Sequence, residues 1–239
     1  MNSSILSAEN LSFKYGEETV LENLNFQFID PSFCVLTGPN GAGKTTLIRI
    51  ITGIEKNYSG ALEVFGVPAN KFVNKGELAY LPQRLNQTSL SLPTTVNDIL
   101  NSNLFKTDDI EWVENIINKL NIKELNNKLI SQLSVGQRQR VWLARSLIAK
   151  PKLIILDEPV SGVDNINQAE FYEILENLFN LNISIILVSH ELEAVAKSAN
   201  LVWCLNRKLI IHKSIDQFTH SNDFEETYGK NHVHLDHKH

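Results

Sequence analysis

Residues 5–28 alternate hydrophobic and polar side chains with a period of two, which is typical of strands with one buried face. Two such stretches follow each other, so the pattern predicts a small antiparallel sheet at the start of the chain. The predicted faces consist of Leu11, Phe13 and Tyr15 in the first stretch and Leu24, Phe26 and Phe28 in the second.

A compact apolar strand is predicted at residues 33–37, followed by a glycine-rich turn and a helix over residues 44–52. The helix carries apolar side chains at helical spacing, and Gly53 marks its end. These apolar positions are Leu47, Ile48 and Ile51. The predicted order is therefore strand, loop, helix.

From about residue 84 to residue 150 the apolar side chains recur at helical spacing, which predicts a helical lobe. Strand patterns return at residues 153–156, 183–188 and 201–205, with a helical stretch between the first two. The helical positions are Trp112, Ile116 and Leu120, then Val141, Ala144 and Ile148, and later Phe171, Leu175 and Leu178. Alternating strands and helices predict an α/β protein with a largely parallel sheet.

Length and composition fit one domain with lobes, because 239 residues with 43% hydrophobic content can bury a substantial core. The formal net charge is -5. Binding to a phosphate backbone normally needs a broad basic surface, so nucleic acid is not expected as a partner.

Several features predict that the chain stays inside the cell. Cys34 and Cys204 each lie in an apolar run, which indicates buried thiols of a reducing compartment instead of a disulfide. The opening residues, MNSSILSAEN, lack the charged start, apolar stretch and cleavage site of a signal peptide. Apolar stretches such as residues 183–188 are far shorter than the roughly 20 residues that cross a bilayer. Any contact with a membrane is expected to need a partner.

The glycine-rich turn matches the phosphate-loop pattern, in which backbone amides and a helix N-terminus surround a phosphate group. Lys44 adds a mobile cation, and Thr45 is predicted to place its hydroxyl on a Mg²⁺ ion that bridges the β- and γ-phosphates. The alternative is a chance glycine-rich loop, which the flanking strand and helix disfavour. The predicted phosphate-binding residues are Gly38, Pro39, Asn40, Gly41, Ala42, Gly43, Lys44, Thr45 and Thr46.

Asp157 and Glu158 end the strand predicted at residues 153–156, and open α/β sheets bind ligands at such carboxyl ends. Asp157 is predicted to hold the metal ion directly or through water. Glu158 is predicted to polarise the water that attacks the γ-phosphate. The alternative is an ordinary strand that ends in a solvated turn at Pro159.

Ser134 is a natural N-cap for a helix that is predicted to run to Pro151, within the segment Leu133-Ser-Val-Gly-Gln137. A helix N-terminus that offers a free hydroxyl and the amide of Gly136 can bind a γ-phosphate. The alternative is that Ser134 only caps the helix. In the order of phosphate loop, this signature segment and the strand-acid pair, the chain resembles the ABC ATPase family over nearly its whole length.

The resemblance implies an α/β fold of the P-loop NTPase, ABC type, with a RecA-like core, a small antiparallel β subdomain and a helical subdomain at about 84–150. The ABC ATPase domain is expected over residues 1–228, followed by a histidine-rich mobile tail at 229–239. ATP and Mg²⁺ are the implied ligands, and the signature residues Ser134, Gly136 and Gln137 are expected to face ATP bound to a second copy of the chain.

The same resemblance implies how the protein is used. ATP hydrolysis is expected to drive transport through a separate integral membrane permease, which is served indirectly by a solute-binding protein. The chain is then expected at the cytoplasmic face of the cell membrane, as a peripheral subunit.

Four further residues match functional positions of the family, and each also has a simpler explanation. Tyr15 matches the aromatic residue that stacks on adenine, although strand alternation equally suits a core position. Gln83 matches the glutamine that senses the metal ion and the attacking water, where an exposed loop amide is the alternative. His190 matches the histidine that contacts the γ-phosphate, where a histidine that merely ends a strand is the alternative. Asp164 matches the loop that crosses to the partner subunit, although turn chemistry alone explains an aspartate there.

The chain departs from the commonest family pattern at two positions. Val135 replaces the usual first glycine of the signature, and Val160 stands where threonine is common. Neither change removes a group that is assigned to catalysis.

The Ser-Val-Gly-Gln signature, the stretch from Glu158 to Asp164 and the histidine-bearing end resemble ATPases of bacterial metal-ion importers, especially zinc uptake systems. Manganese, iron or another solute are alternatives, as is a non-transport assembly factor. Clustered imidazoles, helped by Asp236, can coordinate Zn²⁺. The alternative is a flexible polar tail that binds metals adventitiously. The clustered histidines are His232, His234, His237 and His239.

Overall fold

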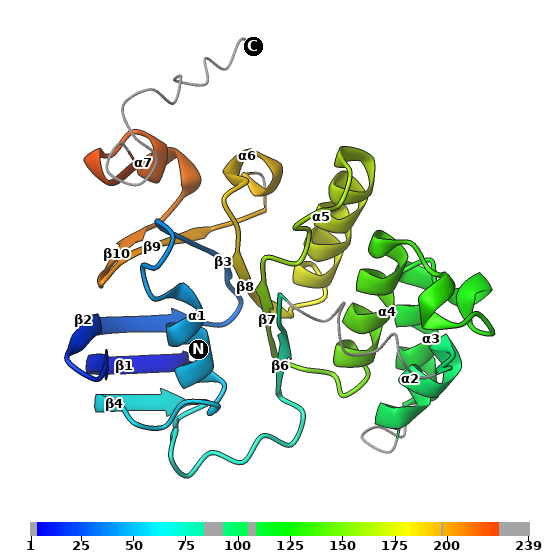
Figure 1. Ribbon diagram of the computed structural model, residues 1–239, viewed down its shortest axis with the longest axis horizontal. Helices are drawn as coiled ribbons and strands as arrows, with labels where there is room; N and C mark the ends of the chain where they lie inside the picture. Colours follow the sequence, from blue (N-terminus) through cyan, green and yellow to red (C-terminus); the bar gives the residue numbers. More distant parts are fainter. Residues whose placement is uncertain (1–3, 84–92, 105–108, 197, 225–239) are drawn as a thin grey trace.

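The computed structural model describes residues 4–83, 93–104, 109–196 and 198–224. Two sheets and the helices around them make up this part of the chain, so the predicted α/β class is confirmed (Figure 1). The N-terminal sheet lies at one side, a group of helices lies at the other, and a central sheet stands between them.

The small N-terminal sheet is antiparallel, as the alternating pattern predicts. Its strands are β1 (Ser4–Tyr15), β2 (Glu18–Ile29), β4 (Ser59–Val64) and β5 (Val67–Pro68). They lie in the order β2-β1-β4-β5. Leu6 pairs with Phe28 and Ala8 with Phe26, so the apolar positions of β1 and β2 share one face and pack into one core cluster.

The central sheet carries the predicted parallel strands. Its strands are β3 (Phe33–Thr37), β6 (Leu78–Leu81), β7 (Leu153–Asp157), β8 (Ser184–Val188), β9 (Leu201–Asn206) and β10 (Lys208–His212). They lie in the order β10-β9-β3-β8-β7-β6, and every pairing is parallel except that of β10 with β9. The loops after β3, β7 and β8 therefore leave the same edge of the sheet.

The helices cover both faces of the central sheet. They are α1 (Lys44–Ile51), α2 (Val96–Leu104), α3 (Ile110–Lys119), α4 (Val135–Leu147), α5 (Asn165–Phe179), α6 (Leu192–Val195) and α7 (Ile215–Thr219). Helix α1 packs on one face together with the small sheet, whereas α4 and α5 pack on the other face (Figure 1).

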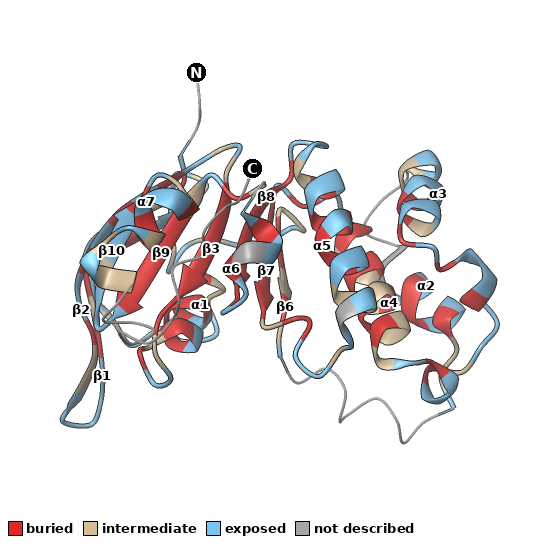
Figure 2. Ribbon diagram, turned by 90° about the horizontal axis from the view of Figure 1, so that it is seen from above, coloured by how far each residue is buried: buried red, intermediate tan, exposed pale blue. Residues whose placement is uncertain are grey.

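Because both faces are covered, the central strands are buried at successive positions and not alternately, as Figure 2 shows for the middle of the molecule. Successive residues of β7 pack into different core clusters. Leu153 and Ile155 pack with α1 and the small sheet, whereas Ile154 and Leu156 pack with α4 and α5. This explains why the central strands appear in the sequence as continuous apolar runs.

The structure corrects one boundary and adds short elements. The helix that begins after Ser134 ends at Leu147 and does not reach Pro151, because Lys150 has a φ of 53° in the left-handed region. Strands β4, β5, β6 and β10 and the helices α6 and α7 have no counterpart in the sequence prediction.

Cys34 and Cys204 are buried free thiols, as predicted. Within the described residues, no helix has both the length and the apolar character needed to cross a membrane.

Candidate nucleotide site

The loop between β3 and α1 is shaped by glycines at positions where a side chain does not fit. A Cβ atom on Gly38, whose φ is 146°, would lie 2.0 Å from the Leu205 carbonyl oxygen of β9. Gly43 has a φ of 97° and forms the N-cap of α1 without a side-chain cap, and the first turn of α1 contains no acidic residue. The loop therefore presents a helix N-terminus to an anion, and neither a capping side chain nor an acidic residue of the first turn competes for it.

Lys44 folds back over this loop. Its Nζ donates hydrogen bonds to the carbonyl oxygens of Gly38, at 2.6 Å, and Pro39, at 3.0 Å, and the residue is only 8% exposed. Burial lowers the pKa of Lys44 from its ordinary value, while the nearby carboxylates of Glu158 and Asp157 act in the opposite direction. A buried ammonium group held by two carbonyls can shift to phosphate oxygens at small cost.

Asp157, at the end of β7, and Thr45, in the first turn of α1, together form a candidate metal site. Its Oδ2 accepts a hydrogen bond from the Thr45 hydroxyl at 3.3 Å and lies 3.5 Å from the Tyr80 hydroxyl of β6. Burial, and next the charge of Glu158, raise the pKa of Asp157. A hydroxyl and a carboxylate are oxygen donors that suit Mg²⁺, and a cation would offset the cost of burying this charge. The residues present therefore fit the ion.

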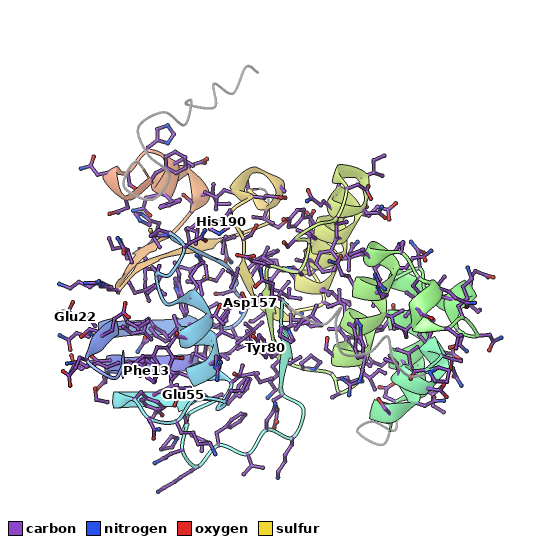
Figure 3. All side chains as sticks on the ribbon, in the orientation of Figure 1. Phe13, Glu22, Glu55, Tyr80, Asp157 and His190 are labelled. Carbon is purple, nitrogen blue, oxygen red and sulfur yellow. The ribbon has the colours of Figure 1, made fainter. Side chains whose placement is uncertain are left out.

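Tyr80 contacts Asp157, and the sequence pattern did not predict a site role for this tyrosine. It lies beside Asp157 in the side-chain view of Figure 3. Burial, followed by the nearby Asp157 charge, raises the pKa of Tyr80 to about 12, so its hydroxyl stays protonated and donates to the carboxylate. A single tyrosine in a short strand carries no pattern that would have revealed this role.

The three predicted catalytic residues meet at Glu158. The Gln83 Nε2 donates to one carboxylate oxygen of Glu158 at 2.5 Å, and the His190 Nε2 lies 3.6 Å from the other. The backbone of Glu158 is left-handed, with a φ of 47°, and its amide donates to the Val188 carbonyl oxygen at 3.2 Å. Such a conformation costs about 1–2 kcal/mol in a non-glycine residue and is frequent at functional sites. The structure thus holds this carboxylate next to the Asp157–Thr45 pair.

The signature residues lie elsewhere. Ser134 is the N-cap of α4: its hydroxyl accepts from the Gln137 amide at 3.2 Å, and the Gln137 side chain accepts from the Ser134 amide at 3.1 Å. Gly136 is buried against Asn167 of α5. Because α4 and α1 pack on opposite faces of the central sheet, the structure does not join these residues to the phosphate loop of the same chain (Figure 1).

The positions of Tyr15 and Asp164 bear on the alternatives left open by the sequence. Tyr15 is 50% exposed, unlike Leu11 and Phe13 of the same strand, and forms an edge-to-face contact with the Phe13 ring at a centroid distance of 4.7 Å. The core alternative is therefore wrong for Tyr15. Asp164 caps α5 by accepting from the Asn167 amide at 3.1 Å, and hydrogen bonds from Asn167 lower the pKa of its carboxyl group. The turn chemistry expected of Asp164 is thus present.

The predicted tail metal site, formed by His232, His234, His237 and His239, lies outside the described residues. In the part of the chain that is described, no group of three or more histidine, cysteine or acidic side chains is arranged to hold a metal ion. The tail metal site is therefore still a prediction from sequence alone.

Known proteins with similar sequences belong to one family. Residues 21–161 match the family model described as ABC transporter. The chain belongs to the ABC transporter family. It is 34% identical over 226 residues to the zinc uptake system ATP-binding protein ZurA of Listeria monocytogenes, and this covers 90% of the chain and 88% of that protein. It is 36% identical over 230 residues to the zinc import ATP-binding protein ZnuC of Ehrlichia chaffeensis, which covers 96% of the chain and 91% of that protein.

Solved structures of ABC transporters share the fold. A putative metal-chelate type ABC transporter in an inward-facing conformation matches with a TM-score of 0.79 and 26% identity over 95% of the chain and 89% of the matched chain. The predicted ABC-type nucleotide-binding fold is therefore confirmed. The central sheet, the small antiparallel sheet and the helical group are the parts of that fold in this ABC transporter family member.

Proposed function

We propose that this chain is the ATP-binding and ATP-hydrolysing subunit of an ABC importer that takes up a metal ion, with zinc as the favoured cargo, through a separate membrane permease. The observation that carries the catalytic part is the Glu158 carboxylate, which contacts both Gln83 and His190 beside the Asp157–Thr45 pair. The names of the relatives, which describe zinc uptake and zinc import at about one-third identity, support the cargo.

Different residues bind the phosphates, the adenine and the metal ion, and others act on the attacking water and the γ-phosphate. The amides of the loop 38–43 and the Lys44 ammonium bind the phosphates, and the exposed ring of Tyr15 stacks on the adenine. Thr45 and Asp157, with Gln83, would hold Mg²⁺, which when bound neutralises charge on the β- and γ-phosphate oxygens. Glu158 orients the attacking water and accepts its proton, while His190 donates to the γ-phosphate.

The arrangement of α1 and α4 supports a second copy of the chain as partner. Ser134, Gly136 and Gln137 pack on the face of the central sheet opposite the phosphate loop, so ATP held at Lys44 reaches a signature segment only in another copy. In this proposal two copies close around two ATP molecules, and hydrolysis opens them again. Asp164 lies in the loop expected to cross between the copies.

The remaining parts of the proposal concern the assembly. Closing and opening act on the permease through the helical subdomain at about residues 84–150, and a solute-binding protein delivers the ion on the other side of the membrane. The ATPase domain spans residues 1–228, and the chain is a peripheral subunit on the cytoplasmic face. The histidines of residues 229–239 are proposed to bind Zn²⁺ as a regulatory signal.

The catalytic proposal is tested by the Glu158→Gln variant. Loss of the general base is expected to reduce kcat for ATP by about 100-fold or more, while ATP affinity is retained and an ATP-bound dimer accumulates. Steady-state phosphate release, nucleotide titration and light scattering measure the three quantities. Glu173→Gln, on the exposed side of α5, is the matched control. Normal turnover by Glu158→Gln would contradict the proposal.

The importer proposal is tested separately with membranes. A tagged chain is expected to copurify with a multispanning protein, and the reconstituted complex is expected to hydrolyse ATP faster with a zinc-loaded binding protein. Stimulation by a manganese- or iron-loaded binding protein alone would reassign the cargo. Copurification with ribosomes or DNA, without any membrane protein, would overturn the transport function.

A further inference from the structure

The residue after His190 makes contacts that the proposed mechanism has not used. Glu191 directs its carboxylate to two side chains of α5: Oε1 accepts from the Gln168 Nε2 at 3.3 Å, and Oε2 accepts from the Tyr172 hydroxyl at 3.1 Å. Gln168 and Tyr172 are four residues apart on one helix, so they are neighbours on the same helical face. Both oxygens of one carboxylate are therefore fixed to α5.

The same side chains are also tied to the segments on either side. The Gln168 Nε2 donates to the Val163 carbonyl oxygen at 3.1 Å, immediately before Asp164. The Ser189 hydroxyl accepts from the Glu191 amide at 3.0 Å and lies 3.5 Å from the Tyr172 hydroxyl. Ser189 and Tyr172 are both 6% exposed. The network therefore joins the loop before α5 to the backbone on both sides of His190.

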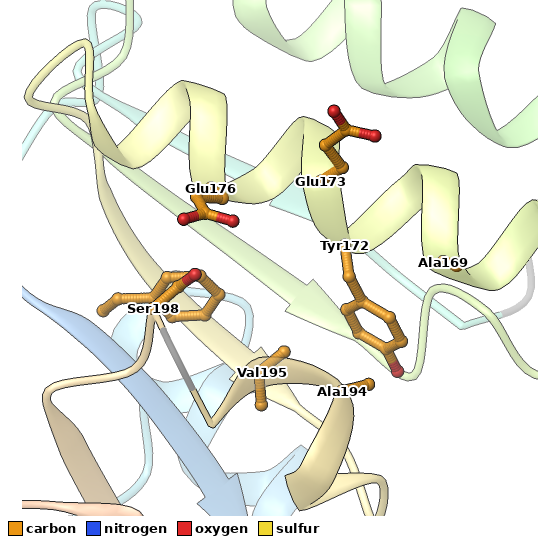
Figure 4. Close-up of a pocket in the computed structure, with 8 residues that line it drawn as sticks. Ala169, Tyr172, Glu173, Glu176, Ala194, Val195 and Ser198 are labelled. Atoms are coloured by element: carbon orange, nitrogen blue, oxygen red, sulfur yellow. The ribbon is translucent and has the colours of Figure 1, made fainter.

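A small pocket lies beside this network. A pocket of about 230 Å³ separates α5 from α6 and is lined on one side by Tyr172 and Glu176 and on the other by Ala194 and Val195 (Figure 4). Helix α6 itself has only four residues. Leu192 and Val195 are nevertheless buried in the same core cluster as Tyr172, so the hydrogen bonds of Glu191 add to side-chain packing in holding this segment to α5.

The chemistry of the network suits a fixed support. Burial is the main cause that raises the pKa of Tyr172 to about 12, so its hydroxyl remains a donor to the Glu191 carboxylate at neutral pH. Hydrogen bonds to a charged group are stronger than those between neutral groups. Removal of the Glu191 carboxylate would take one acceptor from the Tyr172 hydroxyl and one from the Gln168 amide, and would remove the side-chain link between residue 191 and α5.

We infer that Glu191 is a positioning residue for the proposed hydrolysis: it holds His190 beside Glu158 and makes the His190 segment and the loop before Asp164 move as one unit. The inference rests on the proposed function, because His190 acts there on the γ-phosphate. Glu191 has no contact with the reacting atoms in this scheme. Its effect is expected in kcat and not in nucleotide binding, since the phosphate loop lies outside the network.

The test compares Glu191→Ala, Tyr172→Phe and the double variant, with Glu173→Ala on the exposed side of α5 as control. Glu191→Ala is expected to lower kcat about tenfold and to change the KM for ATP less than about twofold, because a misplaced group costs catalysis and not binding. Tyr172→Phe is expected to lower kcat less. The double variant should match Glu191→Ala alone, because the two side chains act through one contact. Glu191→Gln keeps an acceptor for Tyr172 and should recover part of kcat.

Two further measurements separate this inference from a structural role and from the proposed function. The imidazole NMR signals of His190, assigned with a His190→Gln sample, are expected to shift in Glu191→Ala and to stay unchanged in Glu173→Ala. Wild-type kcat and unchanged signals in Glu191→Ala would overturn the inference, as would a fall in Tm that accounts for all lost activity. If the wild-type chain hydrolyses no ATP, the proposed function fails, and the His190 signals still decide the positioning role.

Discussion

The N-termini of α1 and α4 are both candidates for binding phosphate, yet the chain builds them in opposite ways. Helix α1 begins after Gly43 without a side-chain cap, so its first amides have no side-chain acceptor at that position. Helix α4 begins after Ser134, whose hydroxyl already accepts from the Gln137 amide in a reciprocal capping box. The first backbone amides of α1 therefore have no capping side chain, whereas at α4 the Ser134 and Gln137 side chains already accept from backbone amides.

The difference shows what each helix start can offer a nucleotide. At α1 several backbone amides and the buried Lys44 can turn to an anion at once, which suits primary binding. At α4 the Ser134 oxygen is occupied as an acceptor, but its hydroxyl hydrogen remains available as a donor, so the helix can contact a phosphate without losing its cap. In the proposed function, α1 therefore supplies the strong phosphate site of one copy, and α4 supplies a weaker contact to the ATP of the other copy.

The largest expected effect comes from Lys44→Ala, which removes the cation from the open helix start. A charge-assisted hydrogen bond is worth about 1.5–3 kcal/mol, so ATP affinity should fall by about 10- to 100-fold. Equilibrium titration with a fluorescent nucleotide measures it. Lys56→Ala, in a solvent-exposed position, serves as control, and unchanged affinity in Lys44→Ala would remove the basis of the comparison.

The next effect separates capping from ligand binding at α4. In Ser134→Asp the carboxylate still caps the helix, so Tm should stay within about 2 °C, but its charge repels the γ-phosphate of the neighbouring copy. In a Glu158→Gln background, ATP-dependent dimerisation should weaken by about tenfold or more while ATP binding to the monomer is retained. Light scattering at several protein concentrations reports this, and a normal dimer would mean that Ser134 only caps its helix.

Two glycines sharpen the contrast in stability. In Gly43→Ala the residue keeps a φ of 97°, and the new Cβ lies 2.7 Å from the Leu21 Cδ2 atom. Left-handed backbone alone costs about 1–2 kcal/mol, so Tm should fall by about 2–8 °C. In Gly136→Ala the helical backbone accepts alanine and the nearest atom, Asn167 Oδ1, is 3.3 Å away, so thermal unfolding should change by less than about 2 °C. Equal losses in both variants would show that the two helix starts are alike.

The smallest effect is the pH dependence of Tm, which follows from the opposite pKa shifts of Asp157 and Asp164. Burial raises the pKa of Asp157, so its ionised form costs stability above the folded pKa, and this cost disappears as pH falls toward the ordinary value of 3.8. Asp157→Asn should therefore raise Tm by a few degrees at neutral pH in the absence of nucleotide, and the gain should vanish in acid. The pKa of Asp164 is lowered by Asn167, so Asp164→Asn should instead lower Tm at neutral pH. Scanning calorimetry from pH 4 to 8 compares the two, and a lower Tm in Asp157→Asn would contradict the assigned cost.

Sequence predicted the parts of this molecule that depend on local pattern. The strand at residues 33–37, the helix from Lys44 and the cap at Ser134 follow from apolar runs, glycines and a capping side chain, and the structure places them as expected. Strand β5 has only two residues, and β6 only four, so no period exists to detect. Local pattern therefore predicts strands that form continuous apolar runs between glycines or turns, and it misses short strands such as β5 and β6 that tertiary pairing creates.

The contacts between distant residues required the three-dimensional order of the strands. Tyr80 reaches Asp157 because β6 and β7 are neighbours, and Gln168 reaches Glu191 because α5 packs beside the end of β8. Neither pair has a sequence spacing that predicts contact. The meeting of Glu158, Gln83 and His190 followed from family resemblance and not from periodicity.

The close approach of Gly38 to the Leu205 carbonyl has a consequence for the order in which the protein is made. Strand β3 pairs with β8 and β9, and Gly38 approaches the Leu205 carbonyl of β9. These neighbours of the phosphate loop are synthesised long after the loop itself. Parallel pairing of such distant segments is slow compared with local folding. A nascent chain that stops before β8 therefore carries every glycine of the loop but lacks both strands that flank β3 and the Leu205 carbonyl that Gly38 approaches.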